Sequence, residues 1–185
     1  MSKLSFKEFI EKEKAADSRI KSFDWEGRKQ FYLNQIDVLY KNVEDYLREY
    51  IDSHDVTLET THEEIEEEIV GKYEVPVMNI YIYGKHAALV PAGTNMIGTP
   101  GRVDLVGGIE MRRILLADKN RKRPQLFAAV SWTKKQRKQL EKTTMEWLSQ
   151  KYDFIWKFIT DQPDIRFLEV NETSFLRSLQ EVLDG

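Results

Sequence analysis

The fold of this chain is decided by residues 73–117, YEVPVMNIYIYGKHAALVPAGTNMIGTPGRVDLVGGIEMRRILLA. Apolar and polar residues alternate along much of this stretch, as side chains do on the two faces of a β-strand. Glycines separate the alternating runs, so we expect tight turns at Gly84-Lys85 and at Gly107-Gly108. The stretch therefore predicts consecutive antiparallel strands, with no helix between them: one from Tyr73 to the first turn, then 86–90, 102–106 and 109–117.

The N-terminal 53 residues instead carry helical signals. Ser5 followed by Glu8 has the spacing of a capping box, which predicts a first helix. Asp24 can cap a second, longer helix. Its apolar residues recur at intervals of four and three, which is typical of one buried helical face. They are Tyr32, Ile36, Leu39, Val43, Tyr46 and Tyr50.

The segment between these helices and the strands is ambiguous. Residues 56–60 alternate as a strand does, but Thr61 to Val70 fits two structures. Thr61 with Glu64 could begin a short helix that ends at Gly71. The same residues could form a long solvent-facing strand that turns at Gly71.

The C-terminal part predicts a further strand at 126–130 and a third helix over about 134–151, capped by Ser131 or Thr133. A hairpin of 154–160 and 165–170 follows, and Asn171 caps a final helix. The fold class is therefore α+β: two N-terminal helices, an antiparallel β-meander of about six to eight strands, and two helices in the C-terminal half. We expect one domain over 1–185, made of a helical part (1–53), the meander (56–130) and a helix–hairpin–helix part (131–185).

The composition excludes several classes of protein. The chain has 185 residues and no cysteine, which excludes disulfide frameworks, thiolate zinc sites and cysteine nucleophiles. Its first 14 residues contain no apolar run of signal-peptide length, and no segment is apolar enough to span a bilayer. We therefore expect a cytoplasmic protein with no membrane partner. The net charge of −3 is too small to indicate a general polyionic partner.

No cofactor or metal motif stands out. The glycines between Pro91 and Gly108 are followed by a strand, whereas a phosphate-binding loop is followed by a helix that opens with Lys and Ser or Thr. His54, His62 and His86 are too scattered to form a local metal motif, and no serine lies in a nucleophile elbow. We expect no cofactor and no metal.

Asp104, Glu110 and Arg112 carry an alternative hypothesis. An aspartate on a central strand followed by a glutamate and a base on the next strand resembles the site of metal-dependent nucleases, whose carboxylates hold Mg²⁺. Here an arginine replaces the usual lysine, and the spacing across the turn is very tight. A hairpin turning at Gly107-Gly108 would place Asp104 opposite Met111, with two arginines (102 and 113) diagonal to it. A cross-strand charge cluster explains that pattern without a metal.

Charge is strongly segregated along the chain. Nine basic residues and one acid lie between Lys119 and Lys142, whereas six glutamates and no Lys or Arg lie between Glu59 and Glu68. With Trp132 among them, the basic residues could contact phosphates and stack a base. The two segments could equally neutralise each other within the fold or across a dimer, or be solvated faces. The candidate binding residues are Lys119, Arg121, Lys122, Arg123, Trp132, Lys134, Lys135, Arg137 and Lys138.

Two stretches carry a resemblance. Residues 91–108, PAGTNMIGTPGRVDLVGG, and the C-terminal LEVNETSF at 168–175 resemble a recurring element of uncharacterised bacterial proteins. The likeness covers about residues 56–185, with an insertion around 119–150. It implies a shared fold and a bacterial source, and nothing about chemistry.

These patterns favour a non-enzymatic binding or accessory protein that docks a macromolecular partner, either another protein or a second copy of the chain. An anionic partner such as nucleic acid is possible. The alternative is a nucleic-acid-binding or metal-dependent nuclease-like enzyme that uses Asp104 and Glu110.

Overall fold

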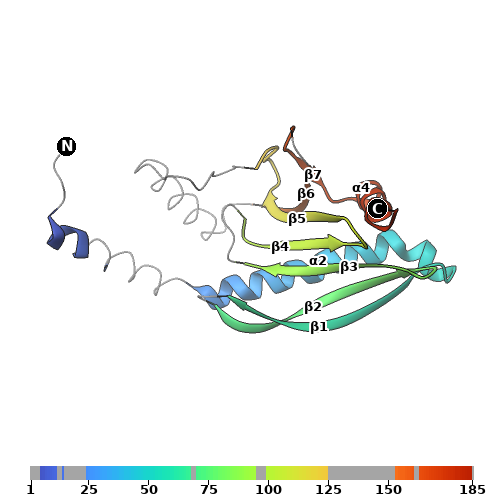
Figure 1. Cartoon of the computed structure of the whole chain (residues 1–185), viewed down its shortest axis with the longest axis horizontal. Helices are drawn as coiled ribbons and strands as arrows, with labels where there is room; N and C mark the ends of the chain where they lie inside the picture. The colour runs from blue at the N-terminus through green and yellow to red at the C-terminus, as the bar shows by residue number, and fades with distance from the viewer. Residues whose placement is uncertain are drawn as a thin grey trace.

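The chain folds as a seven-stranded antiparallel sheet with helices on one face (Figure 1). The computed structural model describes residues 5–11, 14, 24–67, 70–94, 99–124, 153–160 and 163–184. The α+β prediction is confirmed. The strands are hydrogen-bonded in the order β1-β2-β3-β4-β5-β6-β7, and every neighbouring pair is antiparallel. The elements are α2 (Trp25–Asp52), β1 (Thr57–Glu67), β2 (Gly71–Ile82), β3 (Lys85–Gly93), β4 (Arg102–Val106), β5 (Met111–Asp118), β6 (Phe154–Ile159), β7 (Phe167–Glu169) and α4 (Glu172–Asp184). Within the described residues, no helix has the length and apolar character needed to cross a membrane.

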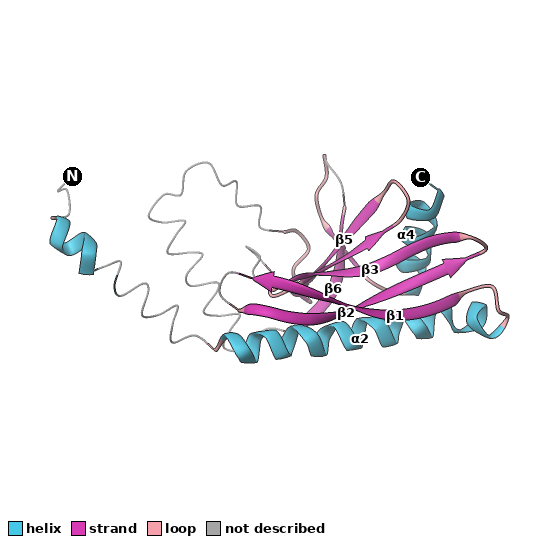
Figure 2. Ribbon diagram, turned by 60° about the horizontal axis from the view of Figure 1, so that its bottom comes forward, coloured by secondary structure: helices cyan, strands magenta, loops and turns pink. Residues whose placement is uncertain are grey.

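Helix α2 begins where the sequence predicts. The carboxylate of Asp24 accepts a hydrogen bond from the Gly27 amide at 2.8 Å, which satisfies one of the free N–H groups of the first turn. The helix runs along the sheet (Figure 2) and buries one stripe of side chains against it. The stripe differs from the prediction in that Tyr40 and Leu47, which were not predicted, are buried, whereas Tyr50 is 41% exposed. Its buried residues are Tyr32, Ile36, Leu39, Tyr40, Val43 and Leu47.

The predicted capping box is formed at the start of the chain. The Ser5 amide donates to the Glu8 carboxylate at 2.7 Å, and the Glu8 amide donates to the Ser5 hydroxyl at 3.3 Å. Residues 6–11 are helical.

The ambiguous segment after α2 is a strand. β1 pairs with β2 along its whole length, from Thr57 opposite Tyr81 to Glu67 opposite Gly71. Gly71 has a φ of +83°, which a glycine adopts without steric cost. The helical alternative is therefore wrong for residues 61–67, the described part of that segment that precedes the turn.

The first predicted turn is displaced by one residue. β2 and β3 are joined by Tyr83-Gly84, not by Gly84-Lys85, and Ile82 pairs with Lys85. Both turn residues have positive φ, +44° and +82°, as a two-residue type I′ turn requires. The Tyr83 hydroxyl is hydrogen-bonded to Asp55, which ties this turn to the end of α2.

The second predicted turn is longer than expected. Val106 pairs with Met111, so four residues, 107–110, connect β4 to β5. A Cβ on Gly107 would lie 1.9 Å from the carbonyl oxygen of Val182 in α4. Gly107 is therefore needed for the close approach of α4, and not for a two-residue hairpin.

Helix α4 closes the core. Asn171 caps it as predicted: its side-chain oxygen accepts from the Ser174 amide at 3.0 Å, and the Ser174 hydroxyl accepts from the Asn171 amide at 2.9 Å. Phe175, Leu179 and Val182 are buried in the cluster that also holds the α2 stripe and the apolar face of the sheet. Both helices thus cover the same face. The predicted hairpin before α4 is formed by β6 and β7.

Two predicted elements, the strand at 126–130 and the helix at 134–151, lie outside the described residues.

The sheet divides between β2 and β3. Their pairing extends from the turn to Met78 opposite Leu89, and beyond this point β2 pairs with β1 alone. The buried Tyr40 of α2 fills the opening, where its hydroxyl lies 2.7 Å from the carbonyl oxygen of Pro76 and 2.9 Å from that of Leu89. At position 76 a backbone N–H would point towards β3, where no strand residue could accept its hydrogen bond. Proline has no amide hydrogen, so Pro76 leaves no donor unpaired there. The far half of β1 and β2 therefore forms a two-stranded ribbon.

We expect Tyr40→Phe to lower the free energy of unfolding by about 1–3 kcal/mol, because the carbonyl oxygens of Pro76 and Leu89 lose a shared donor. Urea denaturation followed by circular dichroism measures this change. The control is Tyr50→Phe in the same helix, where the side chain is 41% exposed and we expect no change. Equal stabilities of the two variants would contradict the role assigned to Tyr40.

Candidate partner-docking groove

Asp104 is held in a partly buried ion pair on β4. The Arg102 guanidinium donates to both of its carboxylate oxygens, from Nε at 2.6 Å and from Nη2 at 2.5 Å. Asp104 is only 8% exposed, and its cross-strand partner is Arg113, not Met111 as the shorter hairpin predicted. The register differs from the prediction by two residues, which leaves every side chain on its predicted face. The expected charge cluster therefore forms, with a different partner.

Glu110 and Arg112 are directed elsewhere. Glu110 lies in the turn before β5 and pairs with Arg112 at 2.8 Å, and Arg112 also contacts Glu181 of α4 at 3.3 Å. Arg112 pairs with Leu105 in the ladder and shares its face, whereas Asp104 occupies the opposite face. The structure does not bring Asp104 together with Glu110 and Arg112. Nor do any three His, Asp or Glu side chains converge in a metal-binding arrangement anywhere in the described part of the chain.

The basic residues that the structure describes, Lys119, Arg121, Lys122 and Arg123, lie in the loop after β5. Lys157 on β6 is 5% exposed, and its ammonium donates to the carbonyl oxygens of Asp118 at 3.0 Å, Lys119 at 2.8 Å and Arg121 at 2.9 Å. Burial lowers the pKa of Lys157, and the three carbonyl oxygens satisfy its three donors. The lysine therefore fixes the start of the basic segment.

The basic side chains themselves are on the surface. Arg123 pairs with Asp164 at 3.3 Å, Lys119 lies 3.9 Å from Asp153, and Lys122 is exposed. Trp132, Lys134, Lys135, Arg137 and Lys138 lie outside the described residues.

The acidic segment lies at the opposite side of the sheet from this loop. Its described glutamates belong to β1, which is the first strand in the sheet order, and three strands separate it from β5. At about 4.8 Å per strand, β1 and β5 are about 19 Å apart. Lys119 and Arg123 pair with Asp153 and Asp164, so these two basic residues do not neutralise β1 within the fold.

β1 presents an open hydrogen-bonding edge. The N–H and C=O of one strand residue point to the same side, and the Pro76 carbonyl points towards Tyr40 and β3, away from β1. Pro76 and its partner His62 are therefore a non-hydrogen-bonded pair, and the backbone polar groups of His62 point outward. The same holds at every second residue of the strand, namely Leu58, Thr60, Glu64 and Glu66. No described strand pairs with this side of β1.

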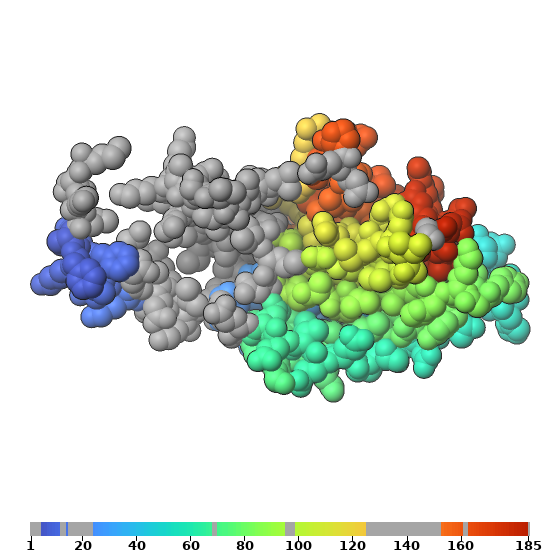
Figure 3. Space-filling model, viewed as in Figure 1, coloured from blue at the N-terminus to red at the C-terminus, as the bar shows by residue number. Residues whose placement is uncertain are grey.

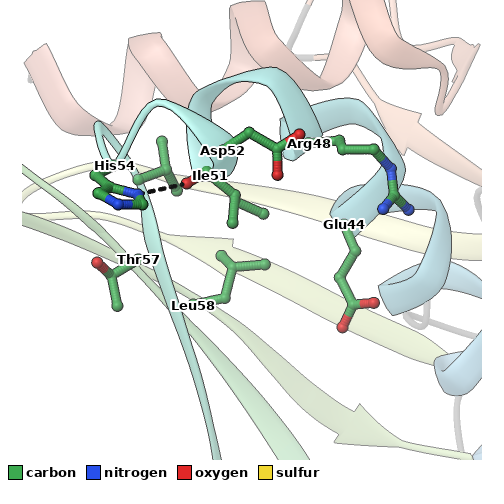
Figure 4. A pocket seen from close by; sticks show the side chains of 8 residues that line it. Glu44, Arg48, Ile51, Asp52, His54, Thr57 and Leu58 are labelled. Carbon is green, nitrogen blue, oxygen red and sulfur yellow. Dashed lines mark hydrogen bonds between the residues drawn. The ribbon is translucent and has the colours of Figure 1, made fainter.

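A groove lies between this edge and α2. One hollow, about 550 Å³, is lined by the C-terminal end of α2 and the first residues of β1 (Figure 4). A second, about 690 Å³, continues along the middle of the helix to β1 and β2, and Glu44 lines both. The lining of the first is Glu44, Arg48, Ile51, Asp52, His54, Val56, Thr57 and Leu58. The lining of the second is Leu33, Asp37, Tyr40, Lys41, Glu44, Thr60, His62, Glu74, Pro76 and Met78.

The groove has an apolar floor and a charged rim. Tyr40 and Met78 are buried at its base, and carboxylates of Asp37, Glu44 and Glu74 line the second hollow beside a single lysine, Lys41. At the other end, the Nδ1 atom of His54 lies 3.3 Å from the carbonyl oxygen of Ile51. The groove is therefore suited to a chain with apolar stems and basic ends, more than to a small anion.

A polar cluster closes the far end of the β1–β2 ribbon. The Glu67 carboxylate accepts from the Thr94 amide at 3.0 Å and from its hydroxyl at 3.1 Å, and the Tyr73 hydroxyl also donates to it. Arg28 of α2 donates to the carbonyl oxygens of Thr94 and Thr99, and burial lowers its pKa. The ribbon, the helix and the loop after β3 are thereby fastened together. Sequence reasoning missed this cluster, because its members are far apart in the chain and form no motif.

Sequence reasoning also missed the groove, although the acidic run on β1 was visible in the sequence.

A scan against protein-family models, a search of the curated proteins and a search of the solved structures each found no match.

We expect Lys157→Met to lower the free energy of unfolding by about 1–3 kcal/mol, because three partly buried carbonyl oxygens lose a donor. Urea denaturation measures the change. Lys122→Met is the matched control, since it removes the same charge from an exposed position in the loop that Lys157 orders. A Lys157→Met protein as stable as the control would contradict the structural role of the buried lysine.

Proposed function

We propose that this protein is a non-enzymatic binding protein that docks a protein partner in the groove between α2 and β1. The observation that carries the proposal is the groove itself, which lies beside an open edge strand. Strand edges with unpaired backbone groups are common sites for binding another chain. The apolar floor would be covered by such a partner, and the charged rim would select it.

The charged residues that suggested chemistry support this interpretation. Asp104 is neutralised by Arg102, and Arg112 by Glu110 and Glu181. In each case the partner is within the same fold, so these groups contribute to its stability. The glutamates of β1 are different, since most of them face solvent.

Docking can be tested by site-specific photo-crosslinking in the cell that makes the protein. A photoreactive phenylalanine replaces Thr60, at the rim of the groove, or Ile109, which is 84% exposed in the β4–β5 turn. We expect a discrete protein adduct from position 60 and none from position 109. The captured protein is then identified and purified.

The second step measures binding of that protein to Thr60→Arg and to Thr173→Arg. The first substitution fills the groove, and the second makes the same change on the exposed first turn of α4. We expect Thr60→Arg to weaken binding by about tenfold or more and Thr173→Arg to leave it unchanged. Absence of an adduct at position 60, or equal binding by the two variants, would refute docking in the groove.

The rival function is a nucleic-acid-binding or nuclease-like protein, and it makes its own predictions. It requires that Mg²⁺ or Mn²⁺ bind at Asp104 and that the basic loop hold phosphates. Because the Asp104 carboxylate is already paired with Arg102, we expect no calorimetric heat with either ion. We also expect no change in nucleic-acid cleavage on Asp104→Asn. Metal-dependent cleavage that Asp104→Asn abolishes would favour the nuclease over the binding protein.

A further inference from the structure

The open edge of β1 is long and accessible, and its charged side chains are acidic. The strand has 11 residues and lies at the margin of the molecule, where Figure 3 shows β1 and β2 in teal and green along the lower side. All but three of its residues are exposed, and the outward backbone groups of Thr60 and His62 have no described strand to pair with. An incoming strand would therefore find a full set of donors and acceptors.

The charge of β1 restricts what can pair with it. Glu59, Glu63 and Glu66 are exposed, and no ion pair to them is described, whereas Glu64 is paired with Lys72 at 2.7 Å. Like charges directly opposite each other destabilise a strand pair, and opposite charges stabilise it. A second copy adding through the same edge would place glutamates against glutamates. Glu59 and Glu63 project from the face of β1 away from α2, and Glu66 projects from the face towards it. A strand with lysine or arginine on both faces would therefore place a base near each free acid.

The groove favours the same occupant. Side chains on the helix side of an added strand would enter the space between β1 and α2, over Leu58, Tyr40 and Met78. Lysine and arginine bury their aliphatic stems on such a surface and keep the charged end in water. The carboxylates of Asp37 and Glu44 lie at the rim, where those ends would emerge.

We infer that the docked partner supplies a basic, extended segment that pairs as an additional antiparallel or parallel strand with the outer edge of β1. This inference rests on the proposed function and names the chemistry of its partner. The backbone of β1 provides affinity, the free glutamates select for positive charge, and the groove receives alternate side chains.

A defined peptide tests this without knowledge of the natural partner. The probe is a fluorescein-labelled peptide of the same length as β1, in which pairs of lysines alternate with pairs of valines so that lysine occurs on both faces of the strand. Its binding to the full chain is measured by fluorescence anisotropy. Two control peptides accompany it. One is methylated on alternate backbone nitrogens, which blocks strand pairing and keeps the charge, and the other replaces lysine by glutamate.

We expect the unmodified peptide to bind, and both control peptides to bind about tenfold more weakly or worse. Binding should also strengthen as salt is lowered. If the methylated peptide binds equally well, the attraction is purely electrostatic and strand addition is refuted. If the glutamate peptide binds equally well, the selection for positive charge is refuted.

Variants of the protein separate the backbone from the charge. The outward N–H of Thr60 is removed by Thr60→Pro without loss of a β1–β2 hydrogen bond, whereas Thr60→Ala keeps that N–H. We expect Thr60→Pro to bind the peptide about tenfold more weakly than Thr60→Ala does. The triple variant Glu59→Gln, Glu63→Gln, Glu66→Gln should bind about tenfold more weakly. Circular dichroism confirms that each variant is folded, and equal binding by all of them would overturn the inference.

Two further outcomes are decisive. Self-association of the chain that Thr60→Pro abolishes, measured by sedimentation velocity, would make the occupant a second copy and refute a basic partner segment. If a partner is captured at position 60 but the lysine peptide does not bind, strand addition is refuted and the docking function is not. Absence of any partner at position 60 would instead refute the docking function itself.

Discussion

The hydroxyl of Tyr40 bridges the carbonyl oxygens of Pro76 and Leu89, and the shape of the molecule depends on this contact. At this point β2 leaves β3 and continues with β1 alone. A split sheet normally leaves unsatisfied backbone groups, and burying them is costly. Here one phenol serves two acceptors, and the proline beside it has no donor to lose. The divided sheet leaves β1 at the end of the strand order, beside α2 and with a groove between them.

The free end of the ribbon is held by a second set of polar contacts. Glu67 binds both the amide and the hydroxyl of Thr94, and Arg28 joins the same loop to the start of α2. Without these contacts the far half of β1 would be part of a two-stranded hairpin, which is marginally stable in water. The ribbon is thus fastened at both ends while its outer edge stays accessible. That combination of rigidity and open backbone is what strand addition requires.

Most of the charged residues that look functional in the sequence stabilise the fold. Asp104 neutralises Arg102, Lys157 orders the loop after β5, and Arg112 links a turn to α4. Each of these side chains is paired within the chain, and a paired group is not available to bind a metal or a substrate. The glutamates on β1 remain directed towards solvent on an edge strand. Edge strands commonly carry charge because it prevents uncontrolled pairing with other copies. A charge of one sign does this and also leaves the edge open to a strand of the opposite charge.

Local features of the sequence determined most of the elements. Asp24 and Asn171 begin helices where a capping side chain predicts them, and the alternation from Tyr73 onward predicted β2 to β5. These signals are local, because a cap or a strand period depends on residues a few positions apart. Only the tertiary structure decided the rest. Thr61 to Glu67 forms a strand because β2 is there to pair with it, although its glutamates and its threonine also fit a helix. The β4–β5 turn has four residues and α4 packs against its Gly107, and with this register the partner of Asp104 is Arg113. The groove depends on Tyr40, Pro76 and Leu89, which are far apart in the chain, so no local pattern can reveal it.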